Sequence, residues 1–288
     1  MTQNRRFLLA RRPNGAPVAE DFSLVSEPLP DLADGQFLIR NHYASLDPAM
    51  RGWMDDAPSY MPPIPLGTPV RASTVGEVVA SKTADFPVGQ WVSGLNAIEE
   101  YSVSQSGGFS AAIDPTIVPS PTNFLSVLGA VGMTAYFGYL EVCKPQPGDV
   151  VLVTGAAGAV GSLVGQIAKI KGARLVIGIA GGPEKCKRLV ERYGFDVAID
   201  YRGKTVDQLS AEIAAAAPDK RGITLAFGAG LALLDDLGLR AGPAPISATR
   251  AIAANQLITP TLWAVSESKT IRAIARVVFF FRSEERRV

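Results

Sequence analysis

Three evenly spaced glycines could form a phosphate-binding turn. They stand in Gly155-Ala-Ala-Gly158-Ala-Val-Gly161, after the apolar run Asp149–Thr154 and before Ser162–Lys171, which has helical spacing. In such a strand–turn–helix unit the middle glycine lets backbone amides approach a pyrophosphate, and the last glycine lets the helix pack against the sheet. The free N–H groups at the helix N-terminus meet the negative charge. The pattern predicts a dinucleotide site; a tight turn without a ligand is the alternative.

The residues after the second strand of this unit bear on the choice of cofactor. NAD-selective sites carry an Asp or Glu there, which bonds the adenine ribose hydroxyl. This chain instead has Ile179-Ala-Gly-Gly182. Without a carboxylate a 2′-phosphate can fit, and Lys185 on the next turn can neutralise it as a point charge. We expect NADP(H) to be favoured over NAD(H); the alternative for Lys185 is a solvated helix lysine.

Metal ligands are scarce in the sequence. His42 is the one histidine, and the two cysteines, Cys143 and Cys186, are far apart. This set can form neither a disulfide framework nor a zinc site. We expect a metal-free protein with a structural histidine and two idle thiols.

Composition is that of an ordinary globular protein. The 288 residues are 47% hydrophobic, and 28 basic residues nearly balance 27 acidic ones. This balance disfavours nucleic acid as a partner. No segment has a signal-peptide core or the ~20 apolar residues of a membrane span. The expectation is a soluble cytoplasmic protein that acts on a small molecule.

Two kinds of element pattern divide the chain. Up to about Ser102, short β-type runs are broken by Pro and Gly, which predicts a compact, bent β lobe. Its clearest predicted strands are Gln36–Ile39, Val75–Ala80 and Trp91–Ser93. The pattern becomes helical over Phe124–Val142, which places a domain boundary near residue 125.

Three α/β steps follow this boundary. After the glycine turn and its helix come a strand at Arg174–Ile179, a helix at Glu184–Tyr193, a strand at Asp196–Ile199 and a helix at Val206–Ala217. Successive steps of this kind are typical of a doubly wound parallel sheet.

From about residue 5 to 222 the sequence resembles the prostaglandin and alkenal reductases of the zinc-free medium-chain dehydrogenase/reductases. The matching segments are Ser45–Gly52, Pro65–Gly67, Gly132–Tyr136, Gly155–Lys171, Gly178–Cys186 and Gly194–Tyr201. The resemblance implies a GroES-like catalytic lobe over 1–125 and a Rossmann lobe over 126–240, with NADPH in the cleft between them. It also implies a homodimer, although the late Rossmann strands that join such dimers are predicted to be absent here.

The resemblance assigns the cofactor-binding residues one by one. The pyrophosphate turn corresponds to Gly158, Ala159, Val160 and Gly161. Lys185 and Tyr201 match positions that hold the 2′-phosphate, and Thr134 matches the region beside the nicotinamide ribose. Tyr201 could instead be a strand-end tyrosine, and Thr134 a helix residue bonding its own backbone.

No catalytic side chain can be assigned. Zinc members of the superfamily bring a cysteine and a Gly-His-Glu sequence to the metal, whereas the corresponding stretches here are Ala44–Asp47 and Gly67–Pro69. Some relatives have a tyrosine two residues after the aspartate that corresponds to Asp47, and this chain has Ala49 there. The remaining pocket candidates, each with a structural role as its alternative, are Asp47, Met50, Arg51 and Tyr60.

The implied function is metal-free reduction of the carbon–carbon double bond of α,β-unsaturated ketones or aldehydes by NADPH. In this reaction hydride passes to the β carbon, and a hydrogen-bond donor steadies the enolate oxygen. A quinone reductase is one alternative. A non-catalytic or unstable truncated remnant is another.

The resemblance stops after about Gly222. The family's Asn-Val-Gly-Gly turn and Gly-Ala-Ile-Ser segment are absent, and the residues that follow are too few for the rest of a Rossmann sheet at ~30 residues per α/β step. We therefore expect an incomplete sheet and an atypical tail over 241–288, produced by a frameshift or truncation. A C-terminus that folds differently is the alternative.

Overall fold

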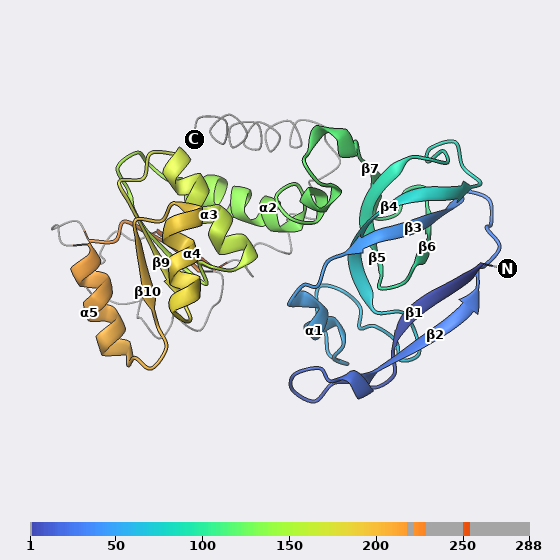
Figure 1. Ribbon diagram of the computed structural model, residues 1–288, viewed down its shortest axis with the longest axis horizontal. Helices are drawn as coiled ribbons and strands as arrows, with labels where there is room; N and C mark the ends of the chain where they lie inside the picture. Colours follow the sequence, from blue (N-terminus) through green and yellow to red (C-terminus); the bar gives the residue numbers. More distant parts are fainter. Residues whose placement is uncertain (1, 218–221, 229–249, 254–288) are drawn as a thin grey trace. The chain divides into compact units, whose positions relative to one another are not determined.

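The computed structural model describes residues 2–217, 222–228 and 250–253 (Figure 1). The chain divides between Leu125 and Ser126 into two compact units, which are described separately below. Among the described residues, no helix has the length and apolar character needed to cross a membrane.

The first unit is built on a curled antiparallel sheet of five strands in the order β6-β3-β4-β5-β7. Its strands are β3 (Gln36–Ala44), β4 (Arg71–Ser81), β5 (Trp91–Ala97), β6 (Tyr101–Gln105) and β7 (Ser110–Ala112). The three strands predicted in this region lie within β3, β4 and β5. The β3–β4 register shifts twice, between Leu38 and Ile39 and between Asn41 and Tyr43. Such bulges increase the local twist and bend the sheet.

A separate antiparallel hairpin and short helices complete this unit. The hairpin is β1 (Gln3–Leu9) with β2 (Phe22–Pro28). The helical elements are η1 (Ala19–Asp21), α1 (Ala49–Trp53), η2 (Pro115–Ile117) and η3 (Pro121–Leu125). Two apolar clusters stabilise the unit, one around Phe37 and Ile39 and one around Met50 and Trp53.

The second unit contains a parallel sheet with helices on both faces. Its strands are β8 (Val150–Thr154), β9 (Leu175–Ala180), β10 (Val197–Asp200), β11 (Leu225–Gly228) and β12 (Arg250–Ala253). Its helices are α2 (Ala130–Tyr136), η4 (Phe137–Val142), α3 (Ala159–Ile170), α4 (Pro183–Tyr193) and α5 (Val206–Ala216). The strand order β10-β9-β8-β11-β12 reverses direction at β8. Ligands of doubly wound sheets bind at the carboxyl ends of the strands beside such a reversal.

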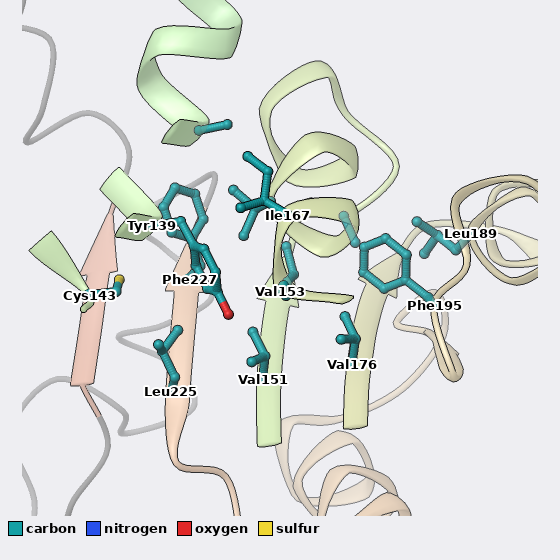
Figure 2. Close-up of a cluster of buried hydrophobic side chains, with 14 of the residues drawn as sticks. Tyr139, Cys143, Val151, Val153, Ile167, Val176, Leu189, Phe195, Leu225 and Phe227 are labelled. Carbon is teal, nitrogen blue, oxygen red and sulfur yellow. The ribbon is translucent and has the colours of Figure 1, made fainter. Parts of the chain in front are cut away.

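Both faces of this sheet are buried, as its apolar strands predict. Val151 and Val153 of β8 pack with α3 and with Phe227 of β11, and Figure 2 shows these side chains on one face. Val150 and Leu152 belong to the cluster on the opposite face, which α5 covers with Leu209 and Ile213 among others. The predicted α/β class, with a GroES-like lobe and a Rossmann sheet, is confirmed.

Two details differ from the sequence prediction. The helical pattern over Phe124–Val142 forms separate elements, with the short helix α2 running directly into the wider π-helical turns of η4. Within the tail predicted to be atypical, Arg250–Ala253 forms β12 and pairs in parallel with β11. With β11 and β12, the sheet has two strands more than the three that the sequence pattern indicated. The rest of the predicted tail, residues 241–249 and 254–288, lies outside the described residues.

Candidate nucleotide-binding site

The turn between β8 and α3 is shaped by close backbone contact. A Cβ atom on Gly161 would lie 2.5 Å from the carbonyl oxygen of Gly155 and 2.8 Å from Cα of Ala156. The Gly158 N–H donates to that same Gly155 oxygen at 2.9 Å. No residue other than glycine fits at Gly161 without moving the backbone.

The same turn leaves the start of α3 open to an anion. Gly158 is the N-cap residue, so no side chain accepts from the first N–H groups of the helix. These groups, on Ala159, Val160 and Gly161, have no partner within an α-helix. A helix N-terminus of this kind binds phosphate through its N–H groups and its dipole.

A further glycine, Gly165, lets α3 lie against the sheet. A Cβ atom there would overlap the ring of Phe195. Phe195 is buried between α3 and α4 in the cluster shown in Figure 2. The sequence analysis missed this residue, because its constraint comes from a ring 30 positions later in the chain.

The turn between β9 and α4 has a different character. Gly182 has φ +100°, a left-handed conformation that favours glycine. Next to it, a Cβ atom on Gly181 would lie 2.9 Å from the hydroxyl of Tyr201, and one on Gly182 would lie 3.0 Å from Nη1 of Arg202. Side chains from the end of β10 therefore border the two glycines.

Asp200 joins the β9–α4 turn to the turn that follows β10. Its Oδ1 accepts the N–H of Gly182 at 2.8 Å and the N–H of Arg202 at 3.0 Å. These two backbone hydrogen bonds lower the pKa of Asp200, and the charges of Arg202 and Lys204 lower it further. The carboxylate stays ionised at neutral pH.

Apart from the glycine turn before α3, the predicted site residues in the second unit fall into two groups. Tyr201 borders Gly181, and Lys185 is exposed on the first turn of α4, the helix that follows the Gly181–Gly182 turn; their contact with a 2′-phosphate stays a prediction. Thr134 is half-buried on α2, and its hydroxyl donates to the Ala130 carbonyl of its own helix at 2.7 Å. A bond to its own backbone is the alternative role that the sequence analysis gave for Thr134. A position of Thr134 beside the nicotinamide ribose stays a prediction.

The pocket candidates of the first unit make mainly structural contacts. Arg51 donates to the carbonyls of Gly15 at 2.7 Å and Pro13 at 3.0 Å, and pairs with Asp55. The Asp47 carboxylate accepts from Ser45 at 3.0 Å.

The other two pocket candidates pack against the α1 region. Met50 is buried in the cluster that contains Trp53. Tyr60 meets the Trp53 ring edge-on, with 6.3 Å between the ring centroids. None of the four candidates gains a chemical role from these contacts.

The scarce metal ligands also lie in structural surroundings. His42 stacks on Trp91, with 4.9 Å between the ring centroids. Cys143 is buried, and burial raises the pKa of the Cys186 thiol, which keeps it protonated. Within the described part of the chain, no three His, Cys, Asp or Glu residues group as metal ligands would.

Comparison with known proteins identifies the family. Residues 5–111 match the family described as the N-terminal domain of oxidoreductase. The crystal structure of CurA from Vibrio vulnificus is 32% identical, covers 98% of this chain and 88% of that one, and superposes with a TM-score of 0.79. The chain belongs to the zinc-free, NADP-dependent reductase family of the medium-chain dehydrogenase/reductases.

Curated relatives in this reductase family match a shorter stretch. The NADPH-dependent curcumin reductase of Escherichia coli is 43% identical over 216 residues, which are 75% of this chain and 61% of the relative. Prostaglandin reductase 1 of Mus musculus is 37% identical over 222 residues, 76% of this chain and 64% of the relative. The match thus spans less than two thirds of the length of either relative.

Proposed function

We propose that this chain binds NADPH and uses it to reduce the carbon–carbon double bond of α,β-unsaturated ketones or aldehydes without a metal. The observation that carries the proposal is the β9–α4 turn. It has two glycines where NAD-selective sites have an acid, and Lys185, Tyr201 and Arg202 lie around it. A second CurA structure, 32% identical with a TM-score of 0.77, is a complex with NADPH, and this supports the choice of cofactor.

The residues present fit that cofactor. The bare N-terminus of α3 receives the pyrophosphate, since the glycines there leave room for close backbone approach. Lys185 and Tyr201 hold the 2′-phosphate, through a positive charge and a hydroxyl group. When bound, the nicotinamide supplies a hydride. The protein orients the cofactor and the substrate and excludes water.

The reaction balances with a proton from solvent. Hydride adds to the β carbon of the enone, the carbonyl oxygen takes the electron pair as an enolate, and protonation at the α carbon completes the reduction. The relatives named as curcumin and prostaglandin reductases favour this class of substrate. A quinone oxidoreductase from Pseudomonas syringae shares the fold at 20% identity, and that likeness extends to the fold alone.

One assay separates the candidate functions. The purified chain is mixed with NADPH and either a medium-chain enone or a quinone, and the loss of reduced-nicotinamide absorbance is followed. Turnover of the enone supports the proposal. Turnover of the quinone alone indicates a quinone reductase, and NADPH binding without turnover of either compound indicates a non-catalytic protein.

A further inference from the structure

The end of β10 brings a second cation to the β9–α4 turn. Nη1 of Arg202 lies 3.0 Å from the point where a Cβ atom on Gly182 would stand, beside the Tyr201 hydroxyl over Gly181. The guanidinium and the phenol thus border adjoining residues of one turn. Lys185 lies on the helical turn that follows.

Within the described part of the chain, Arg202 forms no ion pair with another side chain. Its neighbour Lys204 forms such a pair with Glu212. The nearest anionic group, Asp200, uses Oδ1 to accept two backbone N–H groups, although its charge also attracts the guanidinium. Glu184, exposed on the first turn of α4, is the other carboxylate near this turn. The exposed guanidinium is therefore available to a ligand.

Asp200 fixes the backbone of Arg202 beside the β9–α4 turn. One oxygen atom accepts from Gly182 in the β9–α4 turn and from Arg202 in the turn after β10. The two turns are separate in sequence, and this shared acceptor ties them together beyond the β9–β10 pairing and the bond from the Tyr201 N–H to the Ala180 carbonyl. Loss of the acceptor leaves two backbone N–H groups without this partner and loosens the link between the turns.

We propose that Arg202 is a third group that binds the 2′-phosphate of NADPH, beside Lys185 and Tyr201, and that Asp200 is the positioning residue that holds Arg202 there. The planar guanidinium fork matches phosphate oxygens better than a point charge does. The carboxyl end of the second strand is where a doubly wound fold holds the adenine ribose. This inference rests on the proposed binding of NADPH.

The test is an equilibrium titration with NADPH and with NADH, without substrate, on the wild-type chain, Arg202→Gln and Arg188→Gln. Arg188 is exposed on α4, more than one helical turn beyond Gly182, and serves as the charge-matched control. Loss of one charge-assisted contact should weaken NADPH binding about tenfold to a hundredfold in Arg202→Gln and leave NADH unchanged. Arg188→Gln should match the wild type for both.

Two substitutions at Asp200 distinguish its role as a hydrogen-bond acceptor from the role of its charge. Asp200→Asn keeps an oxygen that can accept both N–H groups, so the preference for NADPH should be kept. Asp200→Ala removes the acceptor and should reduce the preference, with thermal unfolding measured to show that the variant is folded.

The outcomes distinguish this inference from the proposed function. A wild-type chain that binds both cofactors equally overturns the proposed NADPH specificity and the inference with it. A wild-type preference that survives in Arg202→Gln, or equal losses of NADPH and NADH in that variant, overturns the role of Arg202 alone. Loss of the preference in Asp200→Asn overturns the positioning role of Asp200.

Discussion

Under the proposed function, the two turns at the carboxyl edge of the parallel sheet recognise phosphate by different means. The β8–α3 turn presents backbone N–H groups, and its shape requires glycine, since a Cβ atom on Gly161 would lie 2.5 Å from a backbone oxygen. The β9–α4 turn presents side chains from α4 and from the end of β10 around Gly181 and Gly182. The first fits a pyrophosphate, which both nicotinamide cofactors contain, and the second decides whether an extra phosphate is accepted. Affinity and selectivity should therefore change separately.

The largest combined effect, on stability and on the binding of both cofactors, is expected from Gly161→Ala. The added methyl group meets the Gly155 carbonyl and the Ala156 backbone, so the turn must shift. Overpacking of this kind costs on the order of 1–3 kcal/mol, and it should weaken NADPH and NADH binding by a similar factor. Cofactor titration with parallel thermal unfolding measures both effects.

For thermal unfolding, Gly158→Ala is the matched control for Gly161→Ala. Its methyl group would meet one atom, the Gly155 oxygen, at 3.1 Å. We expect a clearly smaller loss of stability. If Gly161→Ala removed NADPH binding and spared NADH, the assignment of this turn to the shared pyrophosphate would be wrong.

Next in size is Lys185→Ala, which alters the second turn alone. One charge-assisted contact to phosphate contributes about 1.5–3 kcal/mol, or about tenfold to a hundredfold in affinity. NADPH should lose that much and NADH nothing, which titration of the variant with each cofactor measures. Equal losses for the two cofactors would show that Lys185 acts on the fold and not on the 2′-phosphate.

Tyr201→Phe should have a smaller effect in the same direction. The ring that packs over Gly181 remains, and the hydroxyl, which carries no full charge, is removed. A hydrogen bond of this kind contributes about 0.5–1.5 kcal/mol. The ratio of the NADPH and NADH dissociation constants measures the change; a ratio equal to that of the wild type would place the hydroxyl outside the phosphate site.

Chelation should have no effect. Neither the sequence, with its single histidine and two separated cysteines, nor the described residues offer a ligand group for zinc. We expect any enone reduction to persist after exhaustive treatment with a chelator. Turnover that stops and is restored by added zinc would contradict this.

The sequence predicted the β8–α3–β9 unit well, because its signals are local. An unbroken apolar run indicates a strand buried on both faces, and glycines at the start of a helical pattern indicate the turn. It also placed Lys185 and Tyr201, through the family resemblance. Tyr201 borders Gly181, and Lys185 lies on the first turn of α4; their binding of the 2′-phosphate stays a prediction.

Other features depend on contacts that sequence spacing does not show. The hairpin partner of Gln3–Leu9 is Phe22–Pro28, across a long irregular connection, and the polar side chains of β1 obscure its strand pattern. The sequence did not single out Arg202, because the Asp200 carboxylate that accepts from its N–H and from the Gly182 N–H joins two turns that are separate in sequence.

The most direct test of the account is a paired titration of the unmodified chain with NADPH and NADH under identical conditions. The β9–α4 turn, with its missing acid and its cations, predicts that NADPH binds more tightly by about tenfold or more. Equal affinities, or tighter binding of NADH, would contradict the central claim that this turn selects the 2′-phosphate.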